Sequence, residues 1–312
     1  MYTTTKSSLG DYDIFGVMDP EHQTGFEVIP EFGARINRLL LTRDQARGVD
    51  IISGFSTAQE ISEDKVSKSA ILFPFPNRIE NGQYQVDGKK YQFPINERDK
   101  QNALHGLLTK AAFSVVKIET RDTEATIELM YTYDGSLEYY PFPFELRLTY
   151  HISDGRSLEL MFDLHNKSDK KLPFGIGWHP YFQLPNWMNV KLQLGDFEHL
   201  KLNEKLIPTG EKRNDHGLHN YVSVDQLELD DCYKKISGDE TLASLINSPL
   251  DLHIDVWGDA RHFDYIQIYT PPLEDSIALE PMTCNVNAFN NGMGLQLLEP
   301  YATFRTTCGV KV

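Results

Sequence analysis

The chain has 312 residues, 40% of them hydrophobic and 11% aromatic, and a chain of this composition folds into a globular protein instead of staying disordered. Its formal net charge of −15 at pH 7 repels phosphate backbones and anionic lipids, so we expect neither a nucleic-acid partner nor a membrane partner. Residues 1–20 lack the apolar run of a secretory signal, and no later stretch approaches the roughly 18 apolar residues of a membrane span. We therefore expect a cytoplasmic protein.

The three cysteines are widely spaced along the chain: Cys232, Cys284 and Cys308. They show neither the close pairs that hold zinc nor the even count of a disulfide framework. We expect reduced, buried thiols.

The first elements in chain order are short. Residues 56–70, "STAQEISEDKVSKSA", have the composition for one or two helical turns. Residues 84–93, "YQVDGKKYQF", place Asp87-Gly88 between two short aromatic strands, and this dipeptide is typical of a tight hairpin turn.

Strict alternation of apolar and polar residues then predicts three consecutive half-buried strands at 125–133, 144–152 and 157–166. The stretch "SDGR" at 153–156 predicts an antiparallel turn between the last two. Residues 252–257, 265–270 and 302–312 are also typical of strands. Many short strands from residue 26 onward, with no linker or low-complexity segment between them, predict one all-β domain over residues 1–312, with few short helices.

Two histidines have unusual neighbours. His179 lies in "GIGWHPYF", where glycines permit close backbone approach and Pro180 restricts His179 to extended backbone angles. His105 lies in "NALHGLL". Each residue alone favours a structural role. Five other histidines, His151, His165, His216, His219 and His253, are expected to be solvated because they fall on polar strand faces or in a polar loop.

A carboxylate that could pair with one of them is Glu280 in "IALEPMT". We expect the strand to end there, because Pro281 lacks the N–H that would continue a ladder. A glutamate at a strand end points into a site or forms a structural ion pair.

Asn77 and Arg78 follow a proline-interrupted aromatic segment in "FPFPNRIENG". The guanidinium offers a rigid fork of donors that suits adjacent sugar hydroxyls as well as a carboxylate, and its structural alternative is a salt bridge. The sequence contains no phosphate-binding glycine loop, no metal-binding histidine motif and no nucleophile elbow. A glycosidase remains open, since two acids on distant strands leave no spacing signal.

These segments resemble the aldose 1-epimerase (galactose mutarotase) family and run in that family's order over about residues 25–312. The matching segments are "EFGARINRLLL", "FPFPNRIENGQYQVDGKKYQF", "NALHGLL", "YYPFPFELRLTY", "GIGWHPYF", "KLIPTGE", "LDDCY" and "IALEPMTCNVNAFNNGMGLQLLEP". The resemblance implies a large antiparallel β-sandwich that interconverts the α and β anomers of a free aldose without cofactor or metal. It further implies a monosaccharide as the partner of a monomer or homodimer.

By the same resemblance, His179 takes the place of the general acid and Glu280 that of the general base. Arg78, His105 and Asp230 in "LDDCY" take substrate-binding places, to which we add Asn77 beside Arg78. Trp178 either stacks on a sugar face or lies in the core. We expect burial and mutual contact to hold the pair as carboxylate and imidazolium.

The sequence departs from the galactose mutarotases around the base, where it has "EPMTCNVNAFNNG" in place of "ETQ" followed by "PDSPN", and it has "EPYATF" in place of "PGE" near its end. The preferred sugar is therefore open. A phosphorylated sugar is less favoured, because lysine and arginine do not cluster near the motifs. The alternative from another class is a non-catalytic sugar-binding or regulatory module on the same fold.

Overall fold

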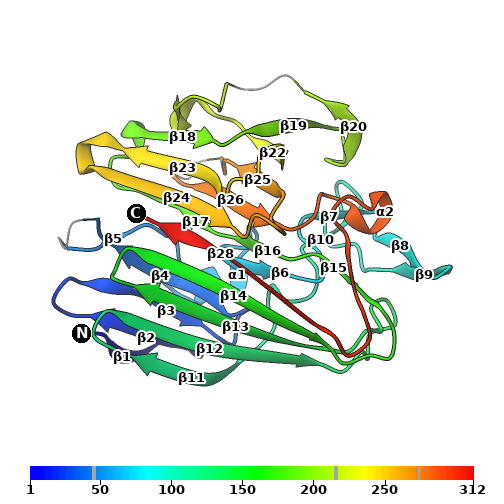
Figure 1. Ribbon diagram of the computed structural model, residues 1–312, viewed down its shortest axis with the longest axis horizontal. Helices are drawn as coiled ribbons and strands as arrows, with labels where there is room; N and C mark the ends of the chain where they lie inside the picture. The colour runs from blue at the N-terminus through cyan, green and yellow to red at the C-terminus, as the bar shows by residue number, and fades with distance from the viewer. Residues whose placement is uncertain (44–46, 214–216, 273–274) are drawn as a thin grey trace.

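The computed structural model describes residues 1–43, 47–213, 217–272 and 275–312, and most of its regular structure is β-strand (Figure 1). Within these ranges the largest sheet has nine antiparallel strands. In spatial order they are β11 (Ser114–Thr120), β12 (Glu124–Tyr133), β13 (Phe144–Ser153), β14 (Ser157–Asn166), β28 (Thr303–Lys311), β24 (Leu252–Gly258), β23 (Thr241–Asn247), β18 (Val190–Leu194) and β21 (Val222–Ser223).

Two further sheets flank it. An eight-stranded sheet contains β20 (Pro208–Lys212), β19 (Phe197–Leu202), β22 (Asp230–Lys235), β25 (Tyr265–Tyr269), β26 (Ile277–Met282), β16 (Gly177–His179) and β6 (Ala70–Leu72), with β17 (Tyr181–Phe182) paired to β26. A five-stranded sheet contains β1 (Thr3–Leu9), β2 (Tyr12–Asp19), β3 (Thr24–Ile29), β4 (Arg35–Leu41) and β5 (Val49–Asp50).

The remaining described elements are short. Three two-stranded pairs are β7 (Arg78–Glu80) with β10 (Asn102–Leu104), β8 (Gln83–Val86) with β9 (Lys89–Gln92), and β15 (Leu172–Phe174) with β27 (Gln296–Leu298). The α-helices are α1 (Ala58–Glu63) and α2 (Ala288–Asn291), and single 3₁₀ turns are η1 (Trp187–Asn189), η2 (Val224–Gln226) and η3 (Ser248–Leu250). The helical turns predicted within residues 56–70 are confirmed by α1, where the Thr57 side chain caps the helix by accepting from the Glu60 N–H at 3.2 Å.

The three alternating stretches are confirmed as β12, β13 and β14. Their buried and half-exposed positions alternate strictly along β13, as expected for a sheet with one face on the core. Both predicted turns are present: Asp87 and Gly88 have φ of 48° and 78°, and Asp154 and Gly155 have φ of 51° and 64°, which are the left-handed conformations that tight hairpins require. The strands predicted later in the chain are confirmed as β24, β25 and β28.

Strands begin earlier than the alternation indicated. The sequence pattern pointed to strands from residue 26, whereas β1 already starts at Thr3. The pattern failed there because β1 is a polar edge strand with no buried residue, so it carries no apolar alternation.

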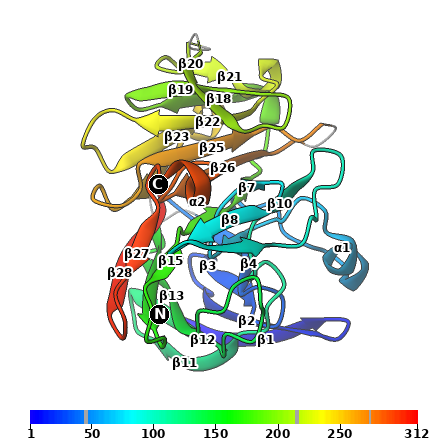
Figure 2. The same cartoon turned by 90° about the vertical axis from the view of Figure 1, so that its right-hand side faces the viewer.

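The sheets pack as the predicted large antiparallel β-sandwich. The five-stranded sheet lies against the β12–β14 end of the nine-stranded sheet, and the eight-stranded sheet lies at its β18–β24 end (Figures 1 and 2). Tyr150 of β13 illustrates the first contact: its ring packs on Phe26 of β3, and its hydroxyl donates to the Ala34 carbonyl at 2.7 Å. Aromatic and branched side chains from most strands form the core between the layers.

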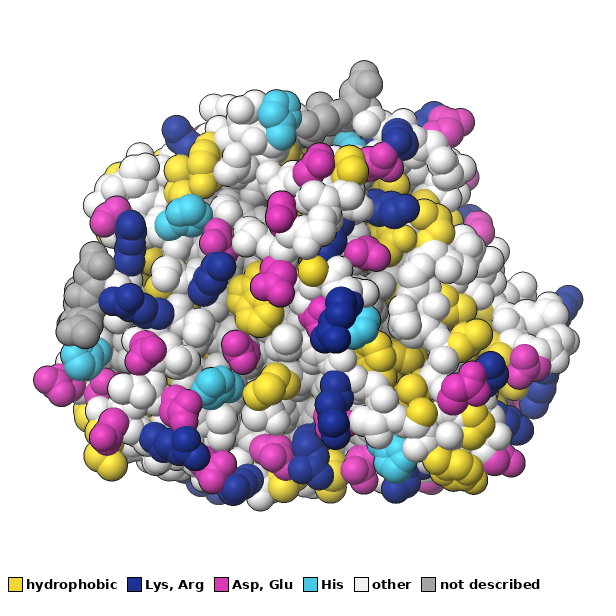
Figure 3. Space-filling view, in the orientation of Figure 1, with side chains coloured by type: hydrophobic (Ala, Val, Ile, Leu, Met, Phe, Trp, Pro, Cys, Tyr) yellow, Lys and Arg dark blue, Asp and Glu magenta, His cyan; other side chains and the backbone are white. Residues whose placement is uncertain are grey.

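In the described part of the chain, no helix has the length and apolar character needed to cross a membrane. On the face in Figure 3, Lys and Arg side chains are interspersed with Asp and Glu. All three cysteines are free and buried, as predicted.

Candidate active site

His179 lies on β16, a strand that packs closely against its neighbours. On β16, successive side chains point to opposite faces, so Trp178 enters the core and His179 faces the cavity. A Cβ on Gly175 would collide with the sulfur of Cys284, which explains the glycine before this strand. The close backbone approach predicted for this segment is therefore present.

Glu280 lies on the neighbouring strand β26, opposite Gln267 of β25. Its Oε1 is 3.3 Å from Nε2 of His179, and both side chains are almost completely buried. The sequence placed these two residues on separate motifs, and the fold brings them into contact.

The expectation that the strand ends at Glu280 is wrong, because β26 continues through Pro281 to Met282. On the side that faces β16 and β17, the Leu279 N–H donates to Pro180 and the Thr283 N–H donates to Ile176. Pro281 falls between them on that side, so pairing with β25 does not need its missing N–H.

Arg78 and His105 come from the short pair of β7 and β10, where Arg78 is opposite Leu104. Asn77 and His105 have φ of 58° and 64°, and the His105 N–H donates to the Asn77 carbonyl at 2.8 Å. These two left-handed residues turn the chain at the end of the pair that faces the cavity. The His105 ring then meets the His179 ring edge-on, with centroids 5.1 Å apart.

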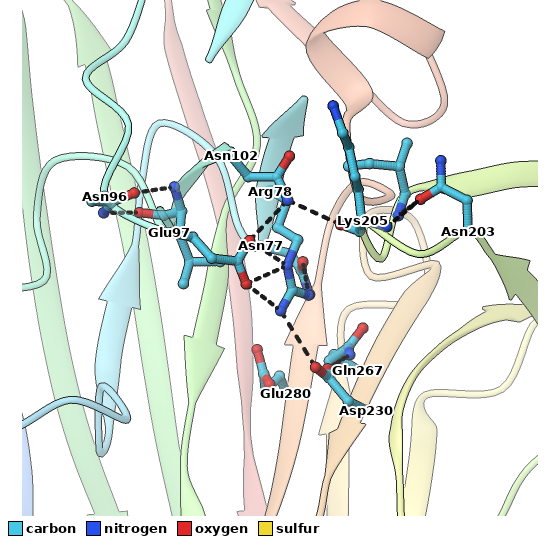
Figure 4. Close-up of polar contacts among 12 residues, drawn as sticks. Asn77, Arg78, Asn96, Glu97, Asn102, Asn203, Lys205, Asp230, Gln267 and Glu280 are labelled. Atoms are coloured by element: carbon cyan, nitrogen blue, oxygen red, sulfur yellow. Dashed lines mark hydrogen bonds and ion pairs between the residues drawn. The ribbon is translucent and has the colours of Figure 1, made fainter. Parts of the chain in front are cut away.

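Together with Asp230 at the start of β22, these residues line one cavity of about 260 Å³. The full lining is Lys65, Val66, Asn77, Arg78, Glu97, Lys100, Leu104, His105, His179, Tyr181, Asp230, Tyr269 and Glu280. Figure 4 shows Arg78 with Glu97 on one side and Asp230, Gln267 and Glu280 below it. Six of the seven predicted site residues are thus brought together; Trp178 is the exception.

Trp178 does not line the cavity. Its side chain has 0% exposure and belongs to the hydrophobic core cluster, which is the position that the core alternative predicts. The reason is the period of the strand, since neighbours of a cavity-facing residue face away from the cavity.

Burial dominates the protonation of the site. The pKa of His179 is lowered to about 3, mainly by desolvation and in smaller part by Arg35 and Arg78, while a backbone hydrogen bond opposes the fall. Burial also raises the pKa of Glu280 well above its ordinary value, with Asp230 adding to the rise and Arg78 opposing it. For His105, burial together with His179 and Arg78 holds the pKa well below its usual range.

These directions correct the expected charge state. In the sugar-free cavity both shifts favour neutral groups, a protonated Glu280 and a neutral His179, because a charge buried without water is costly. The charged form, a Glu280 carboxylate beside a His179 imidazolium, holds the same number of protons, but the shared proton lies on His179 instead of Glu280. The two forms differ by one transfer between atoms 3.3 Å apart.

Two tyrosines in the cavity were missed. Tyr181 stacks on His179 with an interplanar angle of 8°, and its hydroxyl donates to the Val66 carbonyl at 3.0 Å. It stands two positions after His179 in "WHPYF", and the period of a strand could have found it. Tyr269 comes from β25, and nothing in its sequence context separates it from the other strand tyrosines.

The other histidines that the structure describes lie outside this cavity. His151 and His165 are half-buried on the polar faces of β13 and β14, and His253 and His219 are exposed, in agreement with their predicted positions. His216 lies outside the described residues. Over the described ranges, no three His, Cys, Asp or Glu side chains are grouped so that they could hold a metal ion.

A comparison with known families identifies the chain. The aldose 1-epimerase family description matches residues 21–311. The chain belongs to the aldose 1-epimerase family. The expected resemblance is confirmed, and the site described above lies wholly within the matched range.

Relatives in the family are distant. The Escherichia coli (strain K12) protein YihR is 28% identical over 236 residues, covering 73% of this chain and 74% of YihR. Human galactose mutarotase is 27% identical over 188 residues, covering 59% of this chain and 53% of that protein. The chain therefore spans about half the length of this curated mutarotase.

Solved structures of similar fold cover the whole chain. A galactose mutarotase-like protein from Clostridium acetobutylicum has a TM-score of 0.86 at 20% identity, covering 99% of this chain and 97% of that one. A galactose 1-epimerase from Lactobacillus acidophilus NCFM has a TM-score of 0.80 at 16% identity, covering 100% and 98%. Similarity at this level of identity establishes the shared aldose 1-epimerase fold.

Proposed function

We propose that the protein is an aldose 1-epimerase that interconverts the α and β anomers of a free monosaccharide. The observation that carries the proposal is the contact between His179 and Glu280, 3.3 Å apart and buried in one cavity with Arg78, His105 and Asp230. A binding module would not need a buried acid–base pair, because the desolvation of both groups costs stability and adds no affinity.

Ring opening needs two coupled proton transfers. Glu280, as carboxylate, takes the proton of the anomeric hydroxyl; the freed electron pair forms the C1=O1 bond and the bond from C1 to the ring oxygen breaks. His179, as imidazolium, donates its proton to that ring oxygen. Rotation about the C1–C2 bond then exposes the other face of the aldehyde, and the reverse transfers close the ring as the other anomer.

The reaction cycle requires that His179 and Glu280 together hold one shared proton throughout. Opening converts carboxylate and imidazolium into the neutral pair, and closure converts the neutral pair back, so no proton has to enter from solvent in a complete cycle. In the sugar-free protein the neutral pair is favoured by burial. Hydroxyls of the bound sugar supply the hydrogen bonds that stabilise the charged pair.

The size of the cavity supports a monosaccharide. Its volume of about 260 Å³ is below the roughly 300–1,000 Å³ typical of pockets for drug-sized ligands. Arg78, Asp230 and His105 supply donors and acceptors around it for sugar hydroxyls. Asp230 is engaged by Arg78 at 3.3 Å and by Gln267 at 2.6 Å, which leaves it poorly placed to act as a second glycosidase carboxylate.

The test is the rate at which a freshly dissolved pure anomer equilibrates, followed by polarimetry or proton NMR. The sugar panel contains hexoses, pentoses, a uronic acid and a hexose phosphate, because Lys65 and Lys100 also line the cavity. We expect acceleration over buffer for at least one sugar. Glu280→Gln and His179→Asn should each lower the rate constant by roughly 10²–10⁴-fold, the usual contribution of a general acid or base.

Matched controls are available in the same chain. His199→Asn makes the same change at a buried histidine 3.0 Å from Asp231, and Glu128→Gln makes the same change at a glutamate that pairs with Arg147. Neither residue lines the cavity. Both controls should keep the wild-type rate. A wild-type protein no faster than buffer across the panel would overturn the proposal, and sugar binding without acceleration would favour the binding module.

A further inference from the structure

Hydrogen-bond acceptors surround Arg78 (Figure 4). Its Nε donates to both carboxylate oxygens of Glu97, at 3.0 Å each, and Nη2 donates to Oε1 of the same carboxylate at 2.9 Å. Nη1 donates to Oδ1 of Asn77 at 3.0 Å, and Nη2 donates to Oδ2 of Asp230 at 3.3 Å. Contacts with described residues therefore use four of the five N–H groups of the guanidinium, and the fifth belongs to Nη1.

The Glu97 carboxylate is held in place by a hydrogen bond from Asn102. Nδ2 of Asn102, which is completely buried, donates to Oε2 of Glu97 at 2.8 Å and to the Lys205 carbonyl at 2.9 Å. The turn around Lys205, between β19 and β20, is fixed by Asn203, whose Oδ1 accepts from the N–H groups of Lys205 and Ile207 at 2.9 and 3.0 Å. The carboxylate is thus anchored to a turn that lies 103 residues from Asn102 along the chain.

These contacts determine which carboxylate Arg78 pairs with. Arg78 and Glu97 have side chains only 8% and 11% exposed, so their charge-assisted, forked contact is shielded from solvent. Asp230 is the second carboxylate within reach, at the longer distance of 3.3 Å. Without Glu97, the Arg78 guanidinium would pair fully with Asp230, and neither side chain would be available to bind a sugar.

We propose that Glu97, held by Asn102, is a positioning residue for Arg78. It fixes the guanidinium so that one N–H of Nη1 stays available to a sugar hydroxyl, and it keeps Arg78 from closing onto Asp230. The inference rests on the proposed function, in which Arg78 and Asp230 bind the sugar. Glu97 touches no reacting atom in this scheme and acts through Arg78.

The experiment is a double-mutant cycle of Glu97→Gln and Arg78→Lys, with KM and kcat for anomer interconversion measured separately and sugar binding measured by calorimetry. We expect Glu97→Gln to raise KM and the dissociation constant by about tenfold or more while kcat changes less than about threefold, since the lost contacts bind the sugar without taking part in proton transfer. In the Arg78→Lys background, where no fork exists to be held, Glu97→Gln should cost less than about twofold.

A KM within about twofold of wild type for folded Glu97→Gln would overturn the inference, and so would independent, multiplicative effects in the double variant. Should Glu97→Gln unfold below the assay temperature, Glu97→Asp replaces it in the same cycle, because the shorter carboxylate keeps the charge and cannot span both Arg78 and Asn102. Glu128→Gln, which breaks a 2.7 Å contact with Arg147 outside the cavity, is the matched control. An inactive wild type would instead contradict the proposed function, so the two failures are distinguishable.

Discussion

At the residue scale, the proposed reaction depends on the protonation of one buried pair. His179 and Glu280 each gain their position from a different strand, and each has its charged form disfavoured by the removal of water. One proton is shared between the two side chains. The activity should therefore follow the fraction of protein in which the pair holds a single proton.

This predicts the pH profile of kcat/KM. A second proton adds only as the pH falls through the lower pKa, and the single proton leaves only as the pH rises through the higher one. Burial lowers the pKa of His179 to about 3 and raises that of Glu280 well above 4.5, so the two limbs move apart. We expect the acid limb well below pH 6.5, the ordinary histidine value, and the basic limb well above 4.5, the ordinary glutamate value. A narrow bell with its acid limb near the ordinary histidine value would contradict the assignment.

Strand alternation decides the roles of neighbouring residues at the scale of the element. Because β16 points His179 into the cavity, it points Trp178 into the core, and the same rule brings Tyr181 beside His179. The β7–β10 pair contributes in a different way, through left-handed residues at its end that turn Asn77 and His105 toward the site.

The two roles considered for Trp178 predict different outcomes for Trp178→Phe. As a core residue it should cost about 1–3 kcal/mol of unfolding free energy through the cavity it leaves, and KM should stay within about twofold. The indole N–H has no hydrogen-bond partner among the described residues, so its loss adds no further cost. Urea denaturation and anomerisation kinetics measure the two quantities. Unchanged stability with a tenfold higher KM would show that Trp178 contacts the sugar.

At the scale of the whole molecule, the sandwich assembles a site from segments that are far apart in sequence. The eight-stranded sheet contributes His179, Glu280 and Asp230, and the β7–β10 pair contributes Arg78 and adjoins His105. The cavity therefore exists only when these layers are packed together. A single domain over residues 1–312 stays a prediction.

The sequence predicted the parts of this arrangement that leave a local signal. Alternation located β12–β14, Asp-Gly pairs located two turns, and ordered family motifs selected His179 and Glu280. Contacts between distant segments leave no such signal. Two contacts could be identified only from the fold. Asn102 links Glu97 to the turn at Lys205, and Gln267 lies opposite Glu280. The strand end predicted at Glu280 was wrong, because the missing N–H of Pro281 matters only on the side where a neighbouring strand needs it.

The most direct measurement of the central claim uses an aldose that carries ¹⁸O on its anomeric hydroxyl, with anomer exchange and label content followed together by ¹³C NMR. The proposed ring opening by His179 and Glu280 breaks the bond from C1 to the ring oxygen, so we expect the α and β forms to equilibrate faster than in buffer while the label is lost only at the buffer rate. Glu280→Gln should abolish the acceleration. Enzyme-dependent loss of the label would mean that the C1–O1 bond is broken, as in a glycosidase-type displacement, and would contradict the proposed ring opening.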